Sequence, residues 1–217
     1  MIVLVGGEKG GPGKSTTAQN LAAYYVIKRN LDVLLVDADA QATTADWVDE
    51  RNEDPELPVI HCIQKQGRIE KTLLDSDKRY DMVIVDVGGH DNEALRSAMT
   101  VADLMLIPLR PKRRDLKTLS HVSELVTLAK ALNHSVIVRS LITQAPTLPS
   151  LVPRILDAKE VCISFGLEPL QSMTCMRNVY DDIEEGGRSV FESTDKKAIK
   201  EVEQIGDEVF EILEAVK

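Results

Sequence analysis

The sequence predicts an α/β fold: a doubly wound, mostly parallel sheet flanked by helices. Three observations support this prediction. Apolar, strand-like runs alternate with helical patterns along the 217 residues. A glycine-rich stretch joins the first strand to the first helix, and two later strands end in aspartate. Ligands bind such sheets outside the carboxyl ends of the strands, so these features point to a site at one edge.

The strands and helices are read from hydrophobic periodicity. Strands are predicted at residues 2–5, 33–36, 59–62, 82–85, 104–108 and 136–142. Helices are predicted at residues 14–28, 42–52, 68–75, 93–101, 116–132, 150–165 and 195–216. We find no internal repeat, low-complexity tract or linker. The expectation is therefore a single domain over residues 1–217, with no N-terminal helix-turn-helix domain.

Composition narrows the classes of protein that fit. The aromatic content is only 4%, so the core must be mainly aliphatic. The net charge is −9, which does not suit a general polyanion binder, and any DNA contact must come from a local basic patch. Cys62, Cys162 and Cys175 are too scattered for a disulfide framework or a metal site. No signal peptide or run of 18 apolar residues is present, so a cytoplasmic location without membrane contact is expected.

The glycine-rich stretch has the composition of a phosphate-binding loop. It reads Lys9-Gly10-Gly11-Pro12-Gly13-Lys14-Ser15-Thr16. Glycines allow successive backbone N–H groups to point at an anion, and the start of the following helix adds partial positive charge. Lys14 is expected to reach the β- and γ-phosphates, and the Ser15 hydroxyl to ligate Mg²⁺. Pro12 has no N–H, so one donor of the loop is lost.

Two apolar runs end in carboxylates that would face this loop. The first run leads into Asp37 and Asp39, whose i, i+2 spacing places both on one face of an extended strand end. The second run ends at Asp86, which reads as a Walker B aspartate that holds Mg²⁺ through water. Gly88 and Gly89 follow it and make this segment a candidate switch.

Together these motifs resemble the ParA/MinD family of ATPases. The strict phosphate-loop pattern needs glycine at position 8, where this chain has Glu8, and Lys9 instead matches the "deviant" Walker A box of that family. The segment Asp37-Ala38-Asp39-Ala40-Gln41 is similar to the family motif D-x-D-P-Q, with Ala40 in place of proline. Segment 102–108 resembles the A-D-L-x-x-I-P segment common in ParA proteins. Segment 189–193, with the place of Met176-Arg177 before it, resembles the small ParF-like plasmid partition ATPases, to which the chain is most similar.

The resemblance implies a function and roles for residues. Members bind ATP with Mg²⁺, release ADP, dimerise face to face around two nucleotides and then bind DNA non-specifically. A DNA-bound, ParB-like centromere-binding partner stimulates hydrolysis, and the cycle segregates plasmids or chromosomes in association with the nucleoid. By this resemblance Lys9 reaches the nucleotide of the other subunit, Asp39 positions the attacking water, and Asp37 supports the metal shell.

The DNA and adenine contacts are less clearly indicated. A basic cluster, Arg110, Lys112, Arg113, Arg114 and Lys117, follows a strand end and is one candidate DNA surface; the alternative is a solvated loop or a face against the partner subunit. Arg177 and Arg188 are further candidates, which could equally be helix-end or salt-bridge residues. Thr143 and Gln144 follow a strand where relatives often contact the base, and are candidates for adenine contact.

Other functions stay open at this stage. A MinD-like membrane protein would need a basic amphipathic C-terminal helix, but residues 195–217 hold seven acids and four lysines and an apolar stripe suited to core packing. An Fe–S carrier would need suitably placed cysteines, and the three scattered cysteines of this sequence do not provide them. A dethiobiotin-synthetase-like ligase and a positioning ATPase for another cargo both fit the same loop, because a fold does not fix the second substrate.

Overall fold

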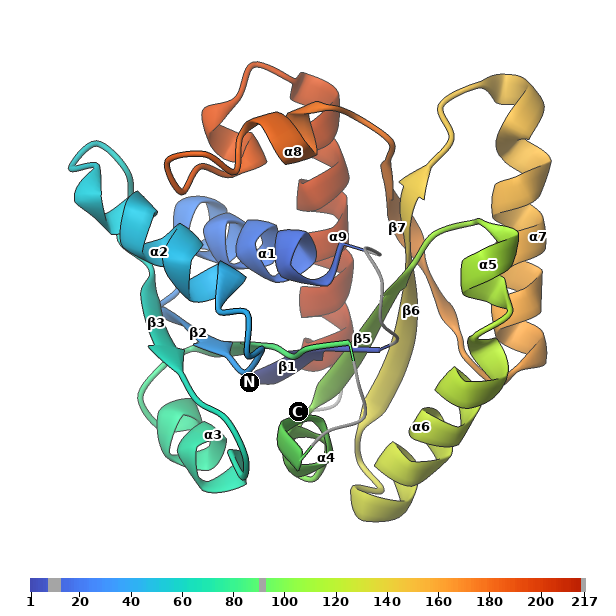
Figure 1. The fold of residues 1–217 in the computed structure, drawn as a ribbon, viewed down its shortest axis with the longest axis horizontal. Helices are drawn as coiled ribbons and strands as arrows, with labels where there is room; N and C mark the ends of the chain where they lie inside the picture. The colour runs from blue at the N-terminus through green and yellow to red at the C-terminus, as the bar shows by residue number, and fades with distance from the viewer. Residues whose placement is uncertain (8–12, 90–92, 216–217) are drawn as a thin grey trace.

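Seven parallel strands form the centre of the molecule, in the computed structural model that describes residues 1–7, 13–89 and 93–215 (Figure 1). Their order across the sheet is β3-β2-β4-β1-β5-β6-β7, and every pairing is parallel. The strands are β1 (Ile2–Val5), β2 (Val33–Asp37), β3 (His61–Gln64), β4 (Met82–Asp86), β5 (Leu104–Leu109), β6 (Ile137–Ala145) and β7 (Pro169–Cys175). The predicted sheet is therefore confirmed, and all seven described strands are parallel.

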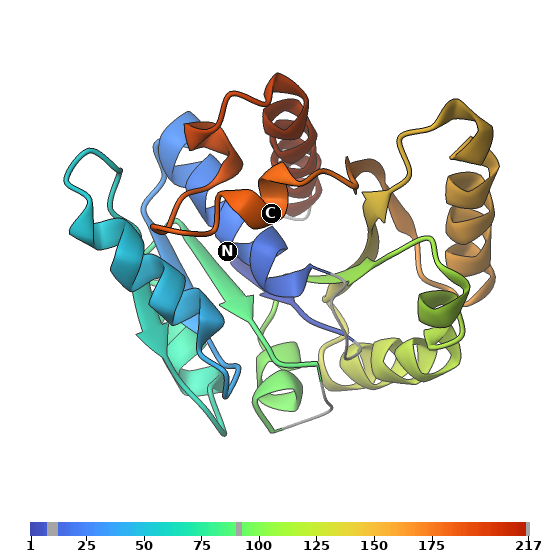
Figure 2. The same cartoon turned by 45° about the horizontal axis from the view of Figure 1, so that its top comes forward.

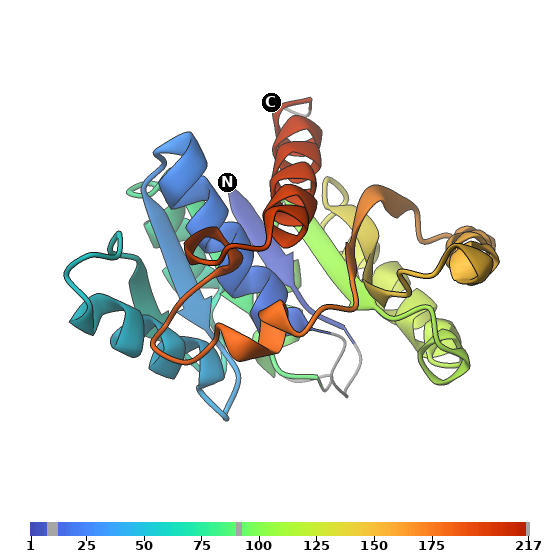
Figure 3. The same ribbon diagram turned by 90° about the horizontal axis from the view of Figure 1, so that it is seen from above.

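Helices cover both faces of this sheet, as the turned views in Figures 2 and 3 show. Apolar residues of α1 (Lys14–Arg29), α2 (Thr43–Glu53), α8 (Val179–Asp182) and α9 (Lys196–Glu214) pack in one core cluster. Residues of α3 (Glu70–Asp77), α4 (Glu93–Met99), α6 (Leu119–Leu132) and α7 (Val152–Ser164) pack in the other, beside the short α5 (Arg113–Leu116). The connections are thus doubly wound, because parallel strands need crossovers and these place helices on both faces.

The register of the central strands brings the site residues together. Asp37, the last residue of β2, lies opposite Asp86, the last residue of β4. Val5, the last residue of β1, also lies opposite Asp86. The chain leaves β1 for one half of the sheet and returns beside it as β5, so the reversal of strand order falls at the end of β1. Ligand sites of open α/β sheets lie at such a reversal.

Strand β7 was missed by the sequence prediction. Its residues alternate too weakly, because β7 lies at the edge of the sheet and carries Gln171, Ser172 and Thr174. The unpaired edge is instead covered by charged side chains. Lys159 Nζ donates to the carbonyl oxygens of Leu170 and Gln171 at 2.8 and 2.9 Å. The Glu208 carboxylate accepts from the backbone N–H groups of Gln171 and Ser172 at 2.7 and 2.8 Å. These contacts satisfy backbone groups that another strand would otherwise pair with.

Other elements differ from the sequence prediction in their bounds. β3 begins two residues later than predicted, because Val59, which is 59% exposed, lies outside the strand. β6 extends to Ala145, which pairs with Cys175 of β7 beyond an irregularity in the register after Ile142. The helix predicted at 116–132 begins at Leu119 as α6, and the short α5 (Arg113–Leu116) precedes it as a separate helix.

The C-terminal helix α9 packs into the core, which confirms the interpretation of its apolar stripe. Val202, Ile205, Val209 and Leu213 are all at most 3% exposed. Gly206 lies against the ring of Tyr24 on α1, where an added Cβ would come within 2.3 Å of a ring carbon. Among the described helices none is both long enough and apolar enough to cross a membrane.

Candidate functional site

The described part of the phosphate loop begins at Gly13, the residue before α1. Gly13 has φ +80°, a conformation that glycine adopts without strain, and its carbonyl accepts from the N–H of Thr17 at 2.9 Å. Lys14, Ser15 and Thr16 form the first turn, with no acidic residue among them. The remaining predicted loop residues, Lys9, Gly10, Gly11 and Pro12, lie outside the described residues.

Asp86 is the buried carboxylate of this site. It is 1% exposed, and its Oδ2 accepts from the Thr44 hydroxyl at 2.7 Å. Its Oδ1 is buried without a hydrogen-bond partner in the described part of the chain. Burial raises the pKa of Asp86 to about 6, against the opposing effects of Thr44, the Ser15 hydroxyl and the Lys14 ammonium. Asp86 therefore lies beside the residues of the phosphate loop, as the sequence predicted.

These groups fit a bound Mg²⁺. A buried carboxylate oxygen without a partner is costly unless a ligand or an ion satisfies it. Mg²⁺ prefers carboxylate, hydroxyl and water oxygens, and in phosphate-loop sites it is held by a loop Ser or Thr and an aspartate. Ser15 and Asp86 supply that pair. The structure thus contains a donor set for the metal, and its occupation stays a prediction.

Asp37 is also buried, but the backbone uses both of its oxygens. Oδ1 accepts from the N–H of Asp39 at 3.0 Å, and Oδ2 accepts from the N–H of Ala45 at 2.8 Å. Burial raises the pKa of Asp37, and these backbone contacts oppose the shift. Asp37 therefore shapes the turn between β2 and α2, in which Ala42 takes the left-handed conformation at φ 55°. Its support of a metal shell stays a prediction.

Asp39 is held in place by this turn and by a close glycine. Its Oδ1 accepts from the N–H of Gln41 at 3.0 Å. A Cβ added at Gly88 would lie 3.2 Å from the Asp39 carboxyl carbon and from both of its oxygens. The segment after β4 thus comes close to Asp39 because residue 88 has no side chain. The carboxylate predicted to act on water is in this way linked to the predicted switch segment.

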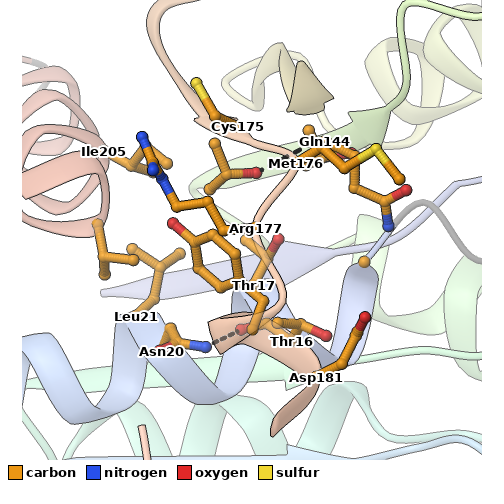
Figure 4. Close-up of a pocket in the computed structure, with 15 residues that line it drawn as sticks. Thr16, Thr17, Asn20, Leu21, Gln144, Cys175, Met176, Arg177, Asp181 and Ile205 are labelled. Atoms are coloured by element: carbon orange, nitrogen blue, oxygen red, sulfur yellow. Dashed lines mark hydrogen bonds between the residues drawn. The ribbon is translucent and has the colours of Figure 1, made fainter. Parts of the chain in front are cut away.

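A cavity continues from the phosphate loop along α1 (Figure 4). One side is formed by α1 and carries Thr16, Thr17, Asn20 and Leu21. The other side is formed by the ends of β6 and β7, by α8 and by α9. Its lining residues there are Thr143, Gln144, Thr174, Cys175, Met176, Arg177, Tyr180, Asp181, Val202 and Ile205. Thr143 and Gln144 thus line the same cavity as Gly13 and Thr16, and their contact with adenine stays a prediction.

Most of this wall was not identified from the sequence. Thr174 and Cys175 are the last residues of β7, which the sequence did not predict, and residues 176–181 follow it. In the sequence only the position of Met176-Arg177 before the 189–193 segment indicated this region. Glu201 of α9 organises the wall: its carboxylate accepts from the N–H of Cys175, the guanidinium of Arg177 and the hydroxyl of Tyr180, at 2.8 to 2.9 Å. The sequence holds one signal for this wall. Glu201 is an acid next to the apolar Val202 on the predicted C-terminal helix, and an acid next to a buried position indicates a charged partner nearby.

The structure separates the candidate DNA-binding cations. Arg177 lines the cavity and is paired with Glu201, so it is not part of an open basic surface. Arg110 forms two ion-pair contacts with Asp115, at 2.8 and 3.0 Å. Arg188 is exposed and lies 3.4 Å from Asp54. These three cations are therefore partly neutralised.

Lys112, Arg113 and Arg114 are exposed, and within the described residues they form no ion pair. Lys117 and Arg154 of α7 border the same shallow groove as Lys112 and Arg113. The basic cluster predicted from one stretch of sequence is thus extended by a residue from another helix.

Comparison with known proteins finds similar sequences over parts of the chain. The family model described as an AAA domain matches residues 1–77, and the model described as ATPase MipZ matches residues 58–145. Protein ParA of Rhizobium radiobacter is 35% identical over 114 residues, which cover 52% of this chain and 50% of that protein. Each of these matches covers part of the chain, and together they show similarity to the ParA/MinD family of deviant Walker A ATPases. The resemblance recognised in the sequence is thereby confirmed, whereas the closeness to ParF-like members stays a prediction.

Two further relatives extend the comparison. The maintenance of carboxysome distribution protein A of Gloeobacter kilaueensis is 31% identical over 137 residues, which cover 63% of this chain and 61% of that protein. The chain therefore spans only about half to three fifths of the length of these two curated relatives. A Cyanothece McdA variant solved in complex with ATP has a TM-score of 0.78 and 15% identity, with 96% of both chains covered, which shows a shared fold.

The buried charge of Asp86 makes a prediction about stability. Its raised pKa means that the folded chain binds a proton more tightly than the unfolded chain between about pH 4 and 6, so stability from this group falls as pH rises through that window. Asp86→Asn has no charge to bury. At pH 8 in EDTA the variant should be more stable than the wild type by roughly 1–3 kcal/mol, and the gap should close toward pH 4. Urea unfolding at both pH values measures it.

The matched control for this experiment is Asp157→Asn, at an exposed position of α7. It removes the same formal charge and should leave stability unchanged at both pH values. A gap that is independent of pH, or an Asp86 variant less stable than the wild type at pH 8, would contradict the account of Asp86 as a buried carboxylate whose charge is only partly compensated.

Proposed function

We propose that this chain is a ParA-type partition ATPase. It binds ATP with Mg²⁺, closes into a dimer around two nucleotides, binds DNA non-specifically in that state, and hydrolyses ATP slowly until a ParB-like partner stimulates it. The observation that carries the proposal is the meeting of Asp37, Asp39 and Asp86 with the start of α1 at one edge of the sheet. Similarity to the ParA/MinD family supports the same reading.

Each site residue has a role in this proposal. Lys14 holds the β- and γ-phosphates, and the N–H groups of the loop add further donors. Bound Mg²⁺ would neutralise phosphate charge, held by Ser15 and by Asp86 through water. Asp39 orients the attacking water in line with the γ-phosphate. Lys9, which lies outside the described residues, acts on the partner subunit's nucleotide, as an arginine finger supplied in trans does in other ATPases.

A second candidate is a positioning ATPase for a cargo other than DNA. The relative from Gloeobacter kilaueensis carries the name of a protein that maintains carboxysome distribution, and it matches more of this chain than the ParA protein does. The two candidates share the nucleotide cycle and differ in the partner. A genetic neighbour that encodes a centromere-binding protein would favour partition, and one that encodes a cargo adaptor would favour positioning.

The coupling of nucleotide to dimer closure is tested with two lysine variants. Wild type should be monomeric without nucleotide and dimeric with ATP or a non-hydrolysable analogue, as measured by light scattering. Lys9→Ala should bind nucleotide and stay monomeric, because the charge that completes the partner's site is missing. Lys14→Ala should lose nucleotide binding itself. A wild type that stays monomeric when saturated with the analogue, or that dimerises equally without it, would overturn the proposal.

The role of Asp39 is tested through Gly88. An added Cβ at Gly88→Ala must push the Asp39 carboxylate by a few tenths of an ångström. Misplacement of a catalytic group by about 1 Å can cost roughly 100-fold in rate, so the rate of phosphate release should fall by about 10-fold or more. Nucleotide affinity should change less than about 2-fold, because the substitution changes no charge and no group that is proposed to bind the nucleotide. An unchanged rate would contradict the claim that Gly88 holds the Asp39 carboxylate in the position that hydrolysis requires.

The exposed cations of α5 are the better of the candidate DNA surfaces. Arg113→Glu with Arg114→Glu should abolish ATP-dependent retention on DNA and make its salt dependence shallower by at least about two units of log–log slope. Nucleotide binding should be unaffected. The control is Lys196→Glu with Lys197→Glu, which changes the net charge equally at exposed positions of α9. Equal loss in both double variants would indicate a net-charge effect, and full retention by the first would exclude this surface.

A further inference from the structure

An acidic side chain from a distant segment reaches the start of α1. The Thr16 hydroxyl donates to Glu184 Oε1 at 3.0 Å, across 168 positions of sequence. Glu184 is partly buried, and burial raises the pKa of its carboxyl group, while the Thr16 hydroxyl opposes the shift and the nearby Asp181 adds to it. A carboxylate thus contacts the first turn of the helix that follows the phosphate loop.

This placement is unexpected for a site that is proposed to bind phosphate. The start of a helix attracts anions through its free N–H groups and its dipole, and here Lys14 adds a full positive charge. Phosphate and carboxylate are both negatively charged. A carboxylate close to a bound phosphate therefore raises the free energy of the complex with nucleotide. Within residues 14–17 the chain has no acid of its own, and Glu184 supplies one.

The backbone that carries Glu184 is anchored to α2. The N–H of Gly186 donates to Glu50 Oε2 at 2.9 Å, and Arg51 Nη1 donates to the carbonyl of Gly187 at 3.0 Å. Gly187 lies so close to α2 that an added Cβ would fall 2.2 Å from the backbone nitrogen of Arg51. The loop therefore cannot move away from α1 without breaking these contacts.

A buried ion pair strengthens this anchor. Arg51 is fully buried, and its Nη2 lies 2.8 Å from Glu192 Oε1. Trp47 Nε1 also donates to the carbonyl of Arg188 at 3.0 Å. Breaking a buried pair leaves an uncompensated charge, so this end of the loop is held firmly. The charge of Glu184 consequently stays near Thr16 unless its side chain alone rotates.

Building on the nucleotide site proposed above, we propose that Glu184 is an affinity-determining residue of that site. Its negative charge competes with nucleotide phosphate for the start of α1 and keeps the affinity lower than the loop alone would give. The consequence is faster release of nucleotide. A molecular switch benefits from this release, since a spent nucleotide that stays bound would hold the protein in one state.

The test compares nucleotide dissociation constants of charge variants. Glu184→Gln keeps a hydrogen-bond acceptor for Thr16 and loses the charge, so ADP and a non-hydrolysable ATP analogue should bind about 3- to 30-fold more tightly at low salt. Salt at about 0.5 M should shrink this gain, because it screens charges. Glu184→Asp keeps the charge and should bind within about 2-fold of the wild type. Isothermal titration calorimetry measures all three.

Glu185→Gln is the matched control, because Glu185 is the exposed neighbour and loses the same charge. Its affinity should equal that of the wild type. An equal gain in both glutamine variants would assign the effect to net charge and overturn the proposal, as would unchanged or weaker binding by Glu184→Gln. Glu184→Ala is a second neutral variant with the same expected gain, should Glu184→Gln fail to fold.

Failure of the inference can be told apart from failure of the proposed function. Wild type that binds nucleotide normally, together with a Glu184→Gln variant that gains nothing, overturns the inference alone. Wild type and both neutral variants that all fail to bind nucleotide overturn the nucleotide site itself, and this inference with it.

Discussion

The site depends on the burial of one charged group, the carboxylate of Asp86. Parallel register places it between the ends of β1 and β2, where one oxygen accepts from Thr44 and the other is buried without a hydrogen-bond partner in the described residues. A charge in this position is tolerable only beside cations or an ion. Lys14 supplies part of that compensation, and a bound Mg²⁺ would supply the rest.

The turn after β2 is built around a second buried carboxylate with a different task. The two carboxylate oxygens of Asp37 accept hydrogen bonds from the N–H groups of Asp39 and Ala45. Asp37 therefore fixes the direction in which the chain enters α2. Two neighbouring aspartates of similar burial thus differ in what they bind. Backbone donors satisfy Asp37 fully, whereas Asp86 keeps an open oxygen. The capacity of the site to attract a cation therefore depends on which carboxylate oxygen lacks a donor, and not on the number of acidic residues.

The C-terminal third of the chain supplies much of the wall of the cavity beside α1. Glu201 of α9 gathers Cys175, Arg177 and Tyr180 into the wall beside α1. The loop that carries Glu184 then crosses from α8 to α2, where Arg51 and Glu192 anchor it. A movement at the first turn of α1 therefore has a continuous path of contacts to the helix behind Asp39. Such a path links sites energetically only if its parts have two arrangements.

The sequence by itself determined the alternation of strands and helices, the phosphate loop and the aspartates at the strand ends. These features are local: periodicity and turn chemistry are written within ten or so neighbouring residues. It did not reveal strand β7, whose unpaired edge is satisfied by Lys159 and Glu208 rather than by apolar alternation. Nor did it decide whether Arg177 is a DNA contact or a salt-bridge residue, whereas the structure pairs Arg177 with Glu201.

Only the tertiary structure decided which charges meet. Arg110 and Arg177 look the same in sequence as Arg113 and Arg114, yet the first two are paired with carboxylates and the last two are exposed. The contact of Glu184 with Thr16 joins residues 168 positions apart, and no periodic pattern encodes it. The physical reason is that a charge acts through space over a few ångströms, while a sequence pattern records only neighbours along the chain.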